Sequence, residues 1–142
     1  MTLILVRLLA GAKLVIEKIK EYVDRAQVLK KNADEAISRG ELDKASEFLW
    51  GIVSCYLNGL KLLRTGKPAS NHRELVRVAE DVEKVLADER FSTAMRNAEK
   101  LHANFYHVFL STRDLAQLYM EIMYALKRLH ELLYREAKHL LT

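Results

Sequence analysis

The first 39 residues place apolar side chains at alternating steps of three and four. These positions are Leu5, Leu8, Ala12, Val15, Ile19, Tyr22, Ala26, Leu29, Ala33 and Ala36. Residues at such spacing share one face of an α-helix, and the sustained alternation is a heptad pattern. It predicts one long helix over 1–39 that packs along a seam. Gly40 follows, and glycine favours the left-handed conformation that ends helices.

Helical periodicity continues through the rest of the chain. The further helices that it predicts span 41–64, 72–88, 91–110 and 111–142. One proline and five glycines among 142 residues leave few interruptions, and no segment alternates as a half-buried strand does. The sequence therefore predicts an all-α, up-and-down helical bundle of about five helices, formed by one domain over 1–142.

Turn and cap residues mark where the predicted helices begin and end. Gly66 and Pro68 lie in the one obvious loop, and Trp50 beside Gly51 predicts a close helix crossing. Ser111 followed by Asp114 three residues later resembles a capping box for the last helix. The candidate caps of the preceding helix are Ser92 and Thr93.

Charge and cysteine content indicate the setting. The formal charge is +4, a mild excess that is compatible with a nucleic-acid partner. The single cysteine, Cys55, has no internal disulfide partner, so we expect a reducing, cytoplasmic compartment. The apolar N-terminus is interrupted by Arg7 and has no positive segment before it, which predicts a helix rather than a signal peptide. Its apolar run is also too short to span a membrane, so no membrane partner is expected.

The predicted first helix is longer than its neighbour. Thirty-nine residues span roughly 58 Å, whereas the second helix spans about 36 Å. The excess apolar face around Leu5, Leu8 and Leu9 therefore needs another surface. We expect a homodimer.

Polar and titratable residues gather on one predicted helix, over 95–110. Its apolar stripe consists of Ala94, Ala98, Leu101, Phe105 and Val108. An adjacent stripe contains Met95, Glu99, His102, Tyr106 and Phe109. A carboxylate, an imidazole and a phenol in a row can orient the imidazole and tune its protonation. The alternative interpretation is a polar cluster that satisfies only its own hydrogen bonds.

Basic residues surround the loop over 65–71. They are Lys61, Arg64, Lys67, Arg73 and Arg77. A basic collar of this kind is a candidate phosphate contact, for which we single out Lys67 and Arg73. The loop has no glycine pattern that cradles phosphate, and an ordinary solvated loop is the alternative.

Two segments carry a family resemblance. ASEFLWGIVSCYLNGLK (45–61) and AEKLHANFY (98–106) resemble the archaeal PaREP family of small helical proteins, and the likeness covers roughly 15–111. In that family an acidic residue often follows the tyrosine, where this chain has His107. The PaREP proteins are similar to the HEPN superfamily of helical bundles, which includes ribonucleases and nucleotide-binding toxin components.

The HEPN resemblance implies a catalytic set. Its ribonucleases have a motif of arginine, a polar residue, any four to six residues and then histidine. Arg96 and Asn97, followed after four residues by His102, match this motif. The resemblance implies His102 as base or acid, Arg96 as phosphate clamp, Asn97 near the scissile bond and Tyr106 as an orienting or stacking group. Positions six apart on a helix differ by about 120° in azimuth, so Arg96 and His102 need a kink or a dimer seam to meet.

The same resemblance extends the candidate ligand site and suggests partners. Glu99, Lys100 and Asn104 complete the candidate ligand-binding residues. The implied function is that of an RNA- or nucleotide-binding module. Its more specific form is an endoribonuclease of toxin–antitoxin type that uses neither cofactor nor metal. A cognate antitoxin or a nucleotidyltransferase is the implied protein partner.

Two other function classes compete with this interpretation. A non-catalytic helical oligomerisation module needs no active residues. A ferritin-like di-iron protein would use Glu99 with His102 and Glu136 with His139, which both have Glu-x-x-His spacing. That site needs two more inward glutamates, and only Glu47 is a possible donor. We therefore expect no metal.

Overall fold

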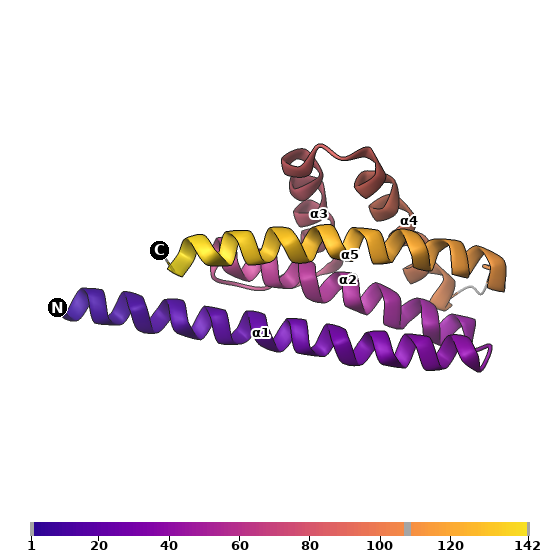
Figure 1. Ribbon diagram of the computed structural model, residues 1–142, viewed down its shortest axis with the longest axis horizontal. Coiled ribbons are helices and arrows are strands. Elements are labelled where there is room, and N and C mark those ends of the chain that lie inside the picture. The colour runs from indigo at the N-terminus through magenta and orange to yellow at the C-terminus, as the bar shows by residue number, and fades with distance from the viewer. Residues whose placement is uncertain (1, 107–108, 142) are drawn as a thin grey trace.

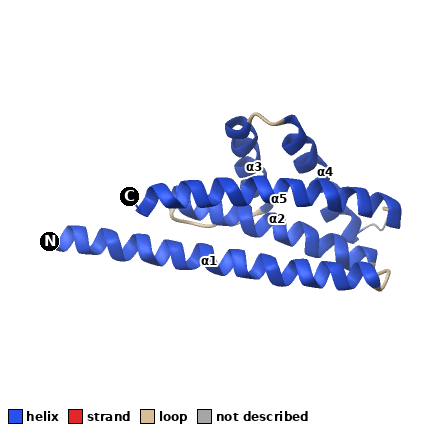
Figure 2. Ribbon diagram, viewed as in Figure 1, coloured by secondary structure: helices blue, strands red, loops and turns tan. Residues whose placement is uncertain are grey.

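The computed structural model describes residues 2–106 and 109–141, with the side chains of residues 9, 105, 106, 140 and 141 outside the description. The helices are α1 (Leu3–Ser38), α2 (Leu42–Thr65), α3 (His72–Leu86), α4 (Glu89–Tyr106) and α5 (Thr112–Leu141). No strand occurs within the described residues (Figure 2). The predicted all-α bundle of about five helices is confirmed.

The helices form two groups (Figure 1). The long helices α1, α2 and α5 lie side by side, and the shorter α3 and α4 project to one side as a hairpin. Helix α2 contacts all four other helices, which makes it the centre of the bundle. Because α3 and α4 intervene along the chain, α5 returns parallel to α2, whereas α1 and α2 form an antiparallel hairpin.

Two glycines allow neighbouring helices to approach α2 closely. A Cβ at Gly51 would lie 3.1 Å from Cδ1 of Leu29 on α1. A Cβ at Gly59 would lie 3.4 Å from Cδ2 of Leu133 on α5. The first contact confirms the close crossing predicted from the Trp50–Gly51 pair. A larger residue at Gly51 would push α1 away, because Leu29 already fills the available space.

Helix α1 is buried along only part of its length. From Ile19 onward it packs against α2 and, in part, α5, and its inward residues Ile19, Val23, Ala26, Ala33 and Ala36 are at most 6% exposed. Its N-terminal part extends beyond the other helices (Figure 1), and there Leu5 is 45% and Leu8 is 65% exposed. The predicted seam is therefore occupied in one half and open in the other.

Most predicted helix ends are confirmed. Gly40 and Gly66 adopt left-handed backbone conformations, with φ of 72° and 79°. At the start of α5 the N–H of Asp114 donates to Oγ of Ser111 over 3.1 Å, and the N–H of Ser111 donates to Oδ2 of Asp114 over 3.4 Å. The predicted capping box is thus present.

The boundary between α3 and α4 differs from the prediction. Ala87 ends α3 in a left-handed conformation, with φ of 48°, and the chain turns at once. Asp88 then caps α4, because its Oδ1 accepts hydrogen bonds from the N–H groups of Arg90 (3.0 Å) and Phe91 (3.2 Å). The predicted caps, Ser92 and Thr93, are wrong because α4 begins earlier and already includes them.

None of the helices in the described part of the chain is both long enough and apolar enough to cross a membrane.

Candidate functional site

Three side-chain rings, one each from α2, α3 and α4, meet at one place. His72, the first residue of α3, stacks on His102 of α4 with 5.3 Å between ring centroids and 14° between ring planes. The ring of Trp50 on α2 lies 5.3 Å from that of His72 and 5.6 Å from that of His102. The two imidazoles are therefore stacked face to face against the only tryptophan of the chain.

Each imidazole faces a carboxylate from a different helix. Nε2 of His72 lies 3.1 Å from Oε2 of Glu99 on α4, and Nδ1 of His102 lies 3.5 Å from Oε2 of Glu47 on α2. The four side chains are between 32% and 46% exposed, so solutes can reach them. We call Glu47, Trp50, His72, Glu99 and His102 the histidine cluster.

Hydrogen bonds of the preceding loop position His72. Oδ1 of Asn58 on α2 accepts the N–H of Ala69 over 2.8 Å, which ties the loop to the middle of α2. Oδ1 of Asn71 then caps α3 by accepting the N–H of Glu74 over 3.0 Å. These bonds place the first residue of α3 over Trp50. Apart from Ala69, which is half-buried, the residues of the loop over 65–71 are exposed, as in an ordinary solvated loop.

A buried polar network holds the C-terminal part of α4, which carries His102. Asn104 is fully buried, and its Nδ2 donates to Oγ of Ser46 over 2.8 Å. Its Oδ1 accepts the N–H groups of Phe109 and Leu110 over 2.7 and 2.9 Å. Asn104, a predicted ligand-binding residue, thus lies in the interior and joins α4 to α2 and to the chain before α5.

Hollows adjoin the histidine cluster on two sides. One of about 470 Å³ lies along α1 and α2 and includes Glu47 and Trp50 in its lining. Another of about 150 Å³ lies among α2, α3 and α4 and includes Trp50, Arg96 and Glu99. A bound molecule could therefore contact the cluster from either side.

The predicted catalytic residues fall on different faces of α4. Arg96 lines the hollow with Trp50 and Glu99, and its Nη2 donates to Oγ1 of Thr93 over 3.2 Å. His102 contacts Trp50 directly. Both residues thus reach the surroundings of Trp50, Arg96 through the hollow that it lines and His102 through its ring. The side chain of Tyr106 lies outside the described residues.

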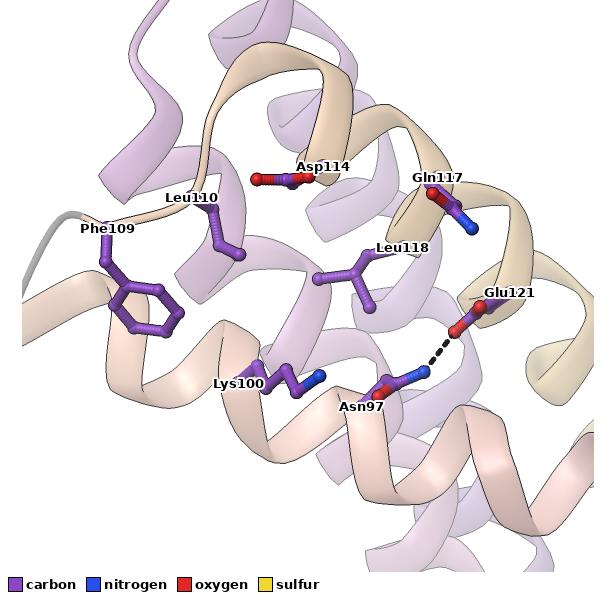
Figure 3. Close-up of a pocket in the computed structure, with 8 residues that line it drawn as sticks. All are labelled: Asn97, Lys100, Phe109, Leu110, Asp114, Gln117, Leu118 and Glu121. Carbon is purple, nitrogen blue, oxygen red and sulfur yellow. Dashed lines mark hydrogen bonds between the residues drawn. The ribbon is translucent and has the colours of Figure 1, made fainter.

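Asn97 and Lys100 face α5 instead. They line a separate pocket of about 410 Å³, in which Nδ2 of Asn97 donates to Oε2 of Glu121 over 2.6 Å (Figure 3). Figure 3 shows both side chains reaching from α4 toward Leu118 and Glu121 on α5. The structure therefore separates these two predicted residues from His102.

The two predicted loop contacts lie apart from the cluster's rings. Lys67 and Arg73 are exposed, at the loop and at the second residue of α3. The carbonyl oxygen of Lys67 accepts from Nζ of Lys61 over 3.4 Å and from Oγ1 of Thr65 over 3.0 Å. Their positively charged groups remain at the surface next to the segment that carries His72.

His72 and Trp50 were not predicted from the sequence to belong to the cluster. Glu47 was considered beside Glu99 and His102 only as a possible donor to a di-iron site. The intrahelical row of Glu99 and His102 was expected to pair, but each binds a group on another helix. The available signal was weak: His72 follows a capping asparagine at the end of a loop, which fixes its backbone but not its neighbours.

The two Glu-x-x-His motifs do not come together. Glu136 accepts both Nε and Nη2 of Arg64, over 2.8 and 2.9 Å, near the end of α2. Glu47 lies near the start of α2, 17 residues away, which corresponds to roughly 25 Å along the helix. Within the described residues no group of three or more histidine, cysteine, aspartate or glutamate side chains is arranged to hold a metal ion.

The architecture is that of an all-α protein with a histidine cluster at the junction of three helices. The profile of the archaeal PaREP1/PaREP8 family matches residues 21–124, nearly three quarters of the chain, and the chain belongs to this family. The matched range includes the whole histidine cluster and confirms the PaREP resemblance. No curated protein and no solved structure matches the chain.

Proposed function

We propose that this protein binds RNA and cleaves it by acid–base catalysis that requires no metal. The observation that carries the proposal is the stacked pair of His72 and His102, each held against a carboxylate. Histidine is the side chain best suited to exchange protons near neutral pH. Two of them side by side supply both a base and an acid at one exposed position.

The reaction that suits this pair is transesterification at a 2′-hydroxyl. One imidazole removes the hydroxyl proton, and the oxygen attacks the adjacent phosphorus. The bond to the 5′-oxygen then breaks, and the second imidazole, initially protonated, donates its proton to that oxygen. The products are a 2′,3′-cyclic phosphate and a 5′-hydroxyl. Glu47 and Glu99 stabilise whichever imidazole carries the extra proton, since each lies within 3.5 Å of a ring nitrogen.

Arg96 supports the proposal from the adjoining hollow. A phosphate placed over Trp50 lies within the region that Arg96 lines together with Glu99. Its guanidinium can offset charge that develops on the phosphate oxygens. The Arg96–Asn97–His102 spacing that resembles HEPN ribonucleases is a second, weaker support.

The test is cleavage of a 5′-labelled single-stranded RNA in excess chelator. We expect cyclic-phosphate products from the wild type and a rate loss of about 100-fold or more in His72→Ala and His102→Ala. His130→Ala is the matched control, because His130 contacts Tyr56 and Tyr134 instead of a carboxylate. Wild-type protein that binds RNA without cleaving it would exclude the catalytic half of the proposal.

A second candidate function is homodimerisation through α1. The exposed apolar residues of its N-terminal part are Leu3, Ile4, Leu5, Val6, Leu8 and Leu14, each at least 45% exposed. Leu5 and Leu8 continue the seam that is buried against α2 further along the same helix, and the other four extend the apolar surface beside it. A second copy of α1 would match this heptad face, because a seam of this kind packs against another like it.

Light scattering at micromolar concentration tests this second proposal. We expect a dimer for the wild type and a monomer for the double variant Leu5→Glu/Leu8→Glu. Val85→Glu is the control, because Val85 is 58% exposed on α3. A monomeric wild type would overturn the proposal.

A further inference from the structure

Two neighbouring hollows follow α1 and α2. One, of about 450 Å³, is lined by residues that include Lys18, Tyr22, Arg25 and Pro68. The other, of about 470 Å³, is the hollow that reaches Glu47 and Trp50 of the histidine cluster. Tyr22 and Arg25 line both, so the two hollows adjoin and form one groove, which we call the α1–α2 groove.

The lining of the α1–α2 groove combines aromatic rings with cations. Tyr22, Phe48 and Trp50 follow it toward the cluster, and Lys18 and Arg25 lie on its α1 side. Arg25 is exposed and makes no ion pair with any residue that the structure describes. Glu21 and Glu47 also line it, so the groove is not strongly basic and any anion it binds must gain from stacking as well.

Aromatic faces with a few well-placed cations are the features that bind single-stranded nucleic acid. Successive bases stack on the rings, while lysine and arginine contact the backbone phosphates. Stacking tolerates any base, because every base has a π face. An apolar protein helix would not use Arg25 or Lys18, whereas the phosphates of a nucleic acid strand would.

We propose that the α1–α2 groove holds the single-stranded RNA next to the bond that the histidine cluster cleaves. Bases stack on Tyr22 and Phe48, Arg25 and Lys18 contact phosphates, and the strand passes Trp50 to reach His72 and His102. The inference rests on the proposed function for the identity of the ligand. It adds the surface that recognises the strand and a preference for single-stranded over duplex RNA.

The binding test uses a fluorescein-labelled ten-nucleotide oligo-uridine with 2′-O-methyl groups, which cannot be cleaved. Fluorescence anisotropy should show a rise in Kd for Arg25→Ala. The slope of log affinity against log salt should become shallower by about 0.7 for each lost phosphate contact, or about 1.4 in Lys18→Ala/Arg25→Ala. Lys127→Ala, an exposed residue on α5, is the control for net charge.

Stacking is tested at Tyr22. Tyr22→Ala should raise Kd by roughly 5- to 100-fold, whereas Tyr22→Phe keeps the ring and should bind nearly as the wild type does. Because Tyr22 is partly buried, a thermal melt of both variants accompanies the measurement. Loss of affinity in both variants equally would contradict stacking.

The outcomes separate this inference from the proposed function. A wild type that binds neither the oligonucleotide nor labelled RNA overturns both. A wild type that binds and cleaves, with groove variants unchanged in Kd and salt slope, overturns the groove inference alone. A change of oligomeric state in Arg25→Ala by light scattering would assign the groove to a second copy of the chain and also overturn it.

Discussion

Two regions in which histidines pack beside α2 differ in the chemical group that faces the imidazole. In the histidine cluster, carboxylates lie against both rings. On the side of α2 that faces α5, Oη of Tyr56 lies 2.9 Å from Nδ1 of His130, and the ring of Tyr134 lies 4.4 Å from that of His130. We call Tyr56, His130 and Tyr134 the tyrosine bridge. A carboxylate stabilises an imidazolium, whereas a neutral phenol mainly fixes the position of a ring.

The surroundings of the two regions differ less. The tyrosine bridge is the first in a row of contacts that fastens α5 to α2. The close approach of Leu133 to Gly59 and the Arg64–Glu136 ion pair follow it along both helices. The histidine cluster adjoins two hollows, and Tyr134 of the tyrosine bridge also lines one, of about 190 Å³. The comparison teaches that the groups facing the imidazole, rather than the presence of histidine or its exposure, distinguish a candidate site from a packing contact.

The largest expected difference between the regions is in cleavage. Glu47→Gln removes the charge beside His102, and we expect the cleavage rate to fall about tenfold. The 3.5 Å contact is a charge–charge attraction rather than a hydrogen bond, and the loss of about 1.4 kcal/mol of that attraction corresponds to tenfold in rate. Tyr56→Phe should leave the rate unchanged. Equal losses in both variants would break the comparison.

The free energy of unfolding should be affected more by Tyr56→Phe than by Glu47→Gln, the reverse of the order expected for cleavage. Tyr56→Phe removes the hydrogen bond to His130 from a side chain that is 8% exposed, and we expect the free energy of unfolding to fall by about 1 kcal/mol. Glu47→Gln should change it by less than about 0.5 kcal/mol, because its ion pair is partly exposed. Urea denaturation measures both. A larger loss in the glutamate variant would assign the histidine cluster a structural role.

Alkaline pH should separate the regions further. Burial raises the pKa of Tyr56 above its ordinary value of 10.0. The unfolded chain therefore loses this proton first, and the stability linked to Tyr56 is present below pH 10 and lost as the pH rises through the higher folded pKa. Tyr56→Phe should flatten the fall in unfolding free energy in that range. An unchanged slope would show that Tyr56 does not contribute to it.

The smallest expected effect is spectroscopic. Trp50 touches both imidazoles of the histidine cluster, and protonated imidazole quenches indole emission. An imidazole that gains a proton becomes a quencher, so the emission of the wild type should fall when acid is added. His72→Ala and His102→Ala should each reduce the amplitude, and His130→Ala should not. An identical titration in all four proteins would place the quenching outside the cluster.

The sequence by itself determined the helices and most of their ends. Left-handed glycines at Gly40 and Gly66 and the Ser111–Asp114 box act through neighbouring residues, so their effect can be predicted from local chemistry. The same holds for the buried stripe of Ala94, Ala98 and Leu101, which follows from helical spacing alone. The one cap predicted wrongly lies where Ala87 adopts a backbone conformation that alanine rarely takes.

Only the tertiary structure decided which side chains meet at the candidate site. Because each residue of α4 rotates about 100° around the axis, Asn97 faces α5, while His102 faces α2 and Arg96 lines the hollow beside α3. His72 and His102 are 30 residues apart in the sequence. They touch because a hydrogen bond from the loop to Asn58 positions His72, while the hydrogen bond from Asn104 to Ser46 holds α4 against α2. Such contacts depend on how three helices pack against one another, and helical periodicity specifies the face of each helix but not its neighbour.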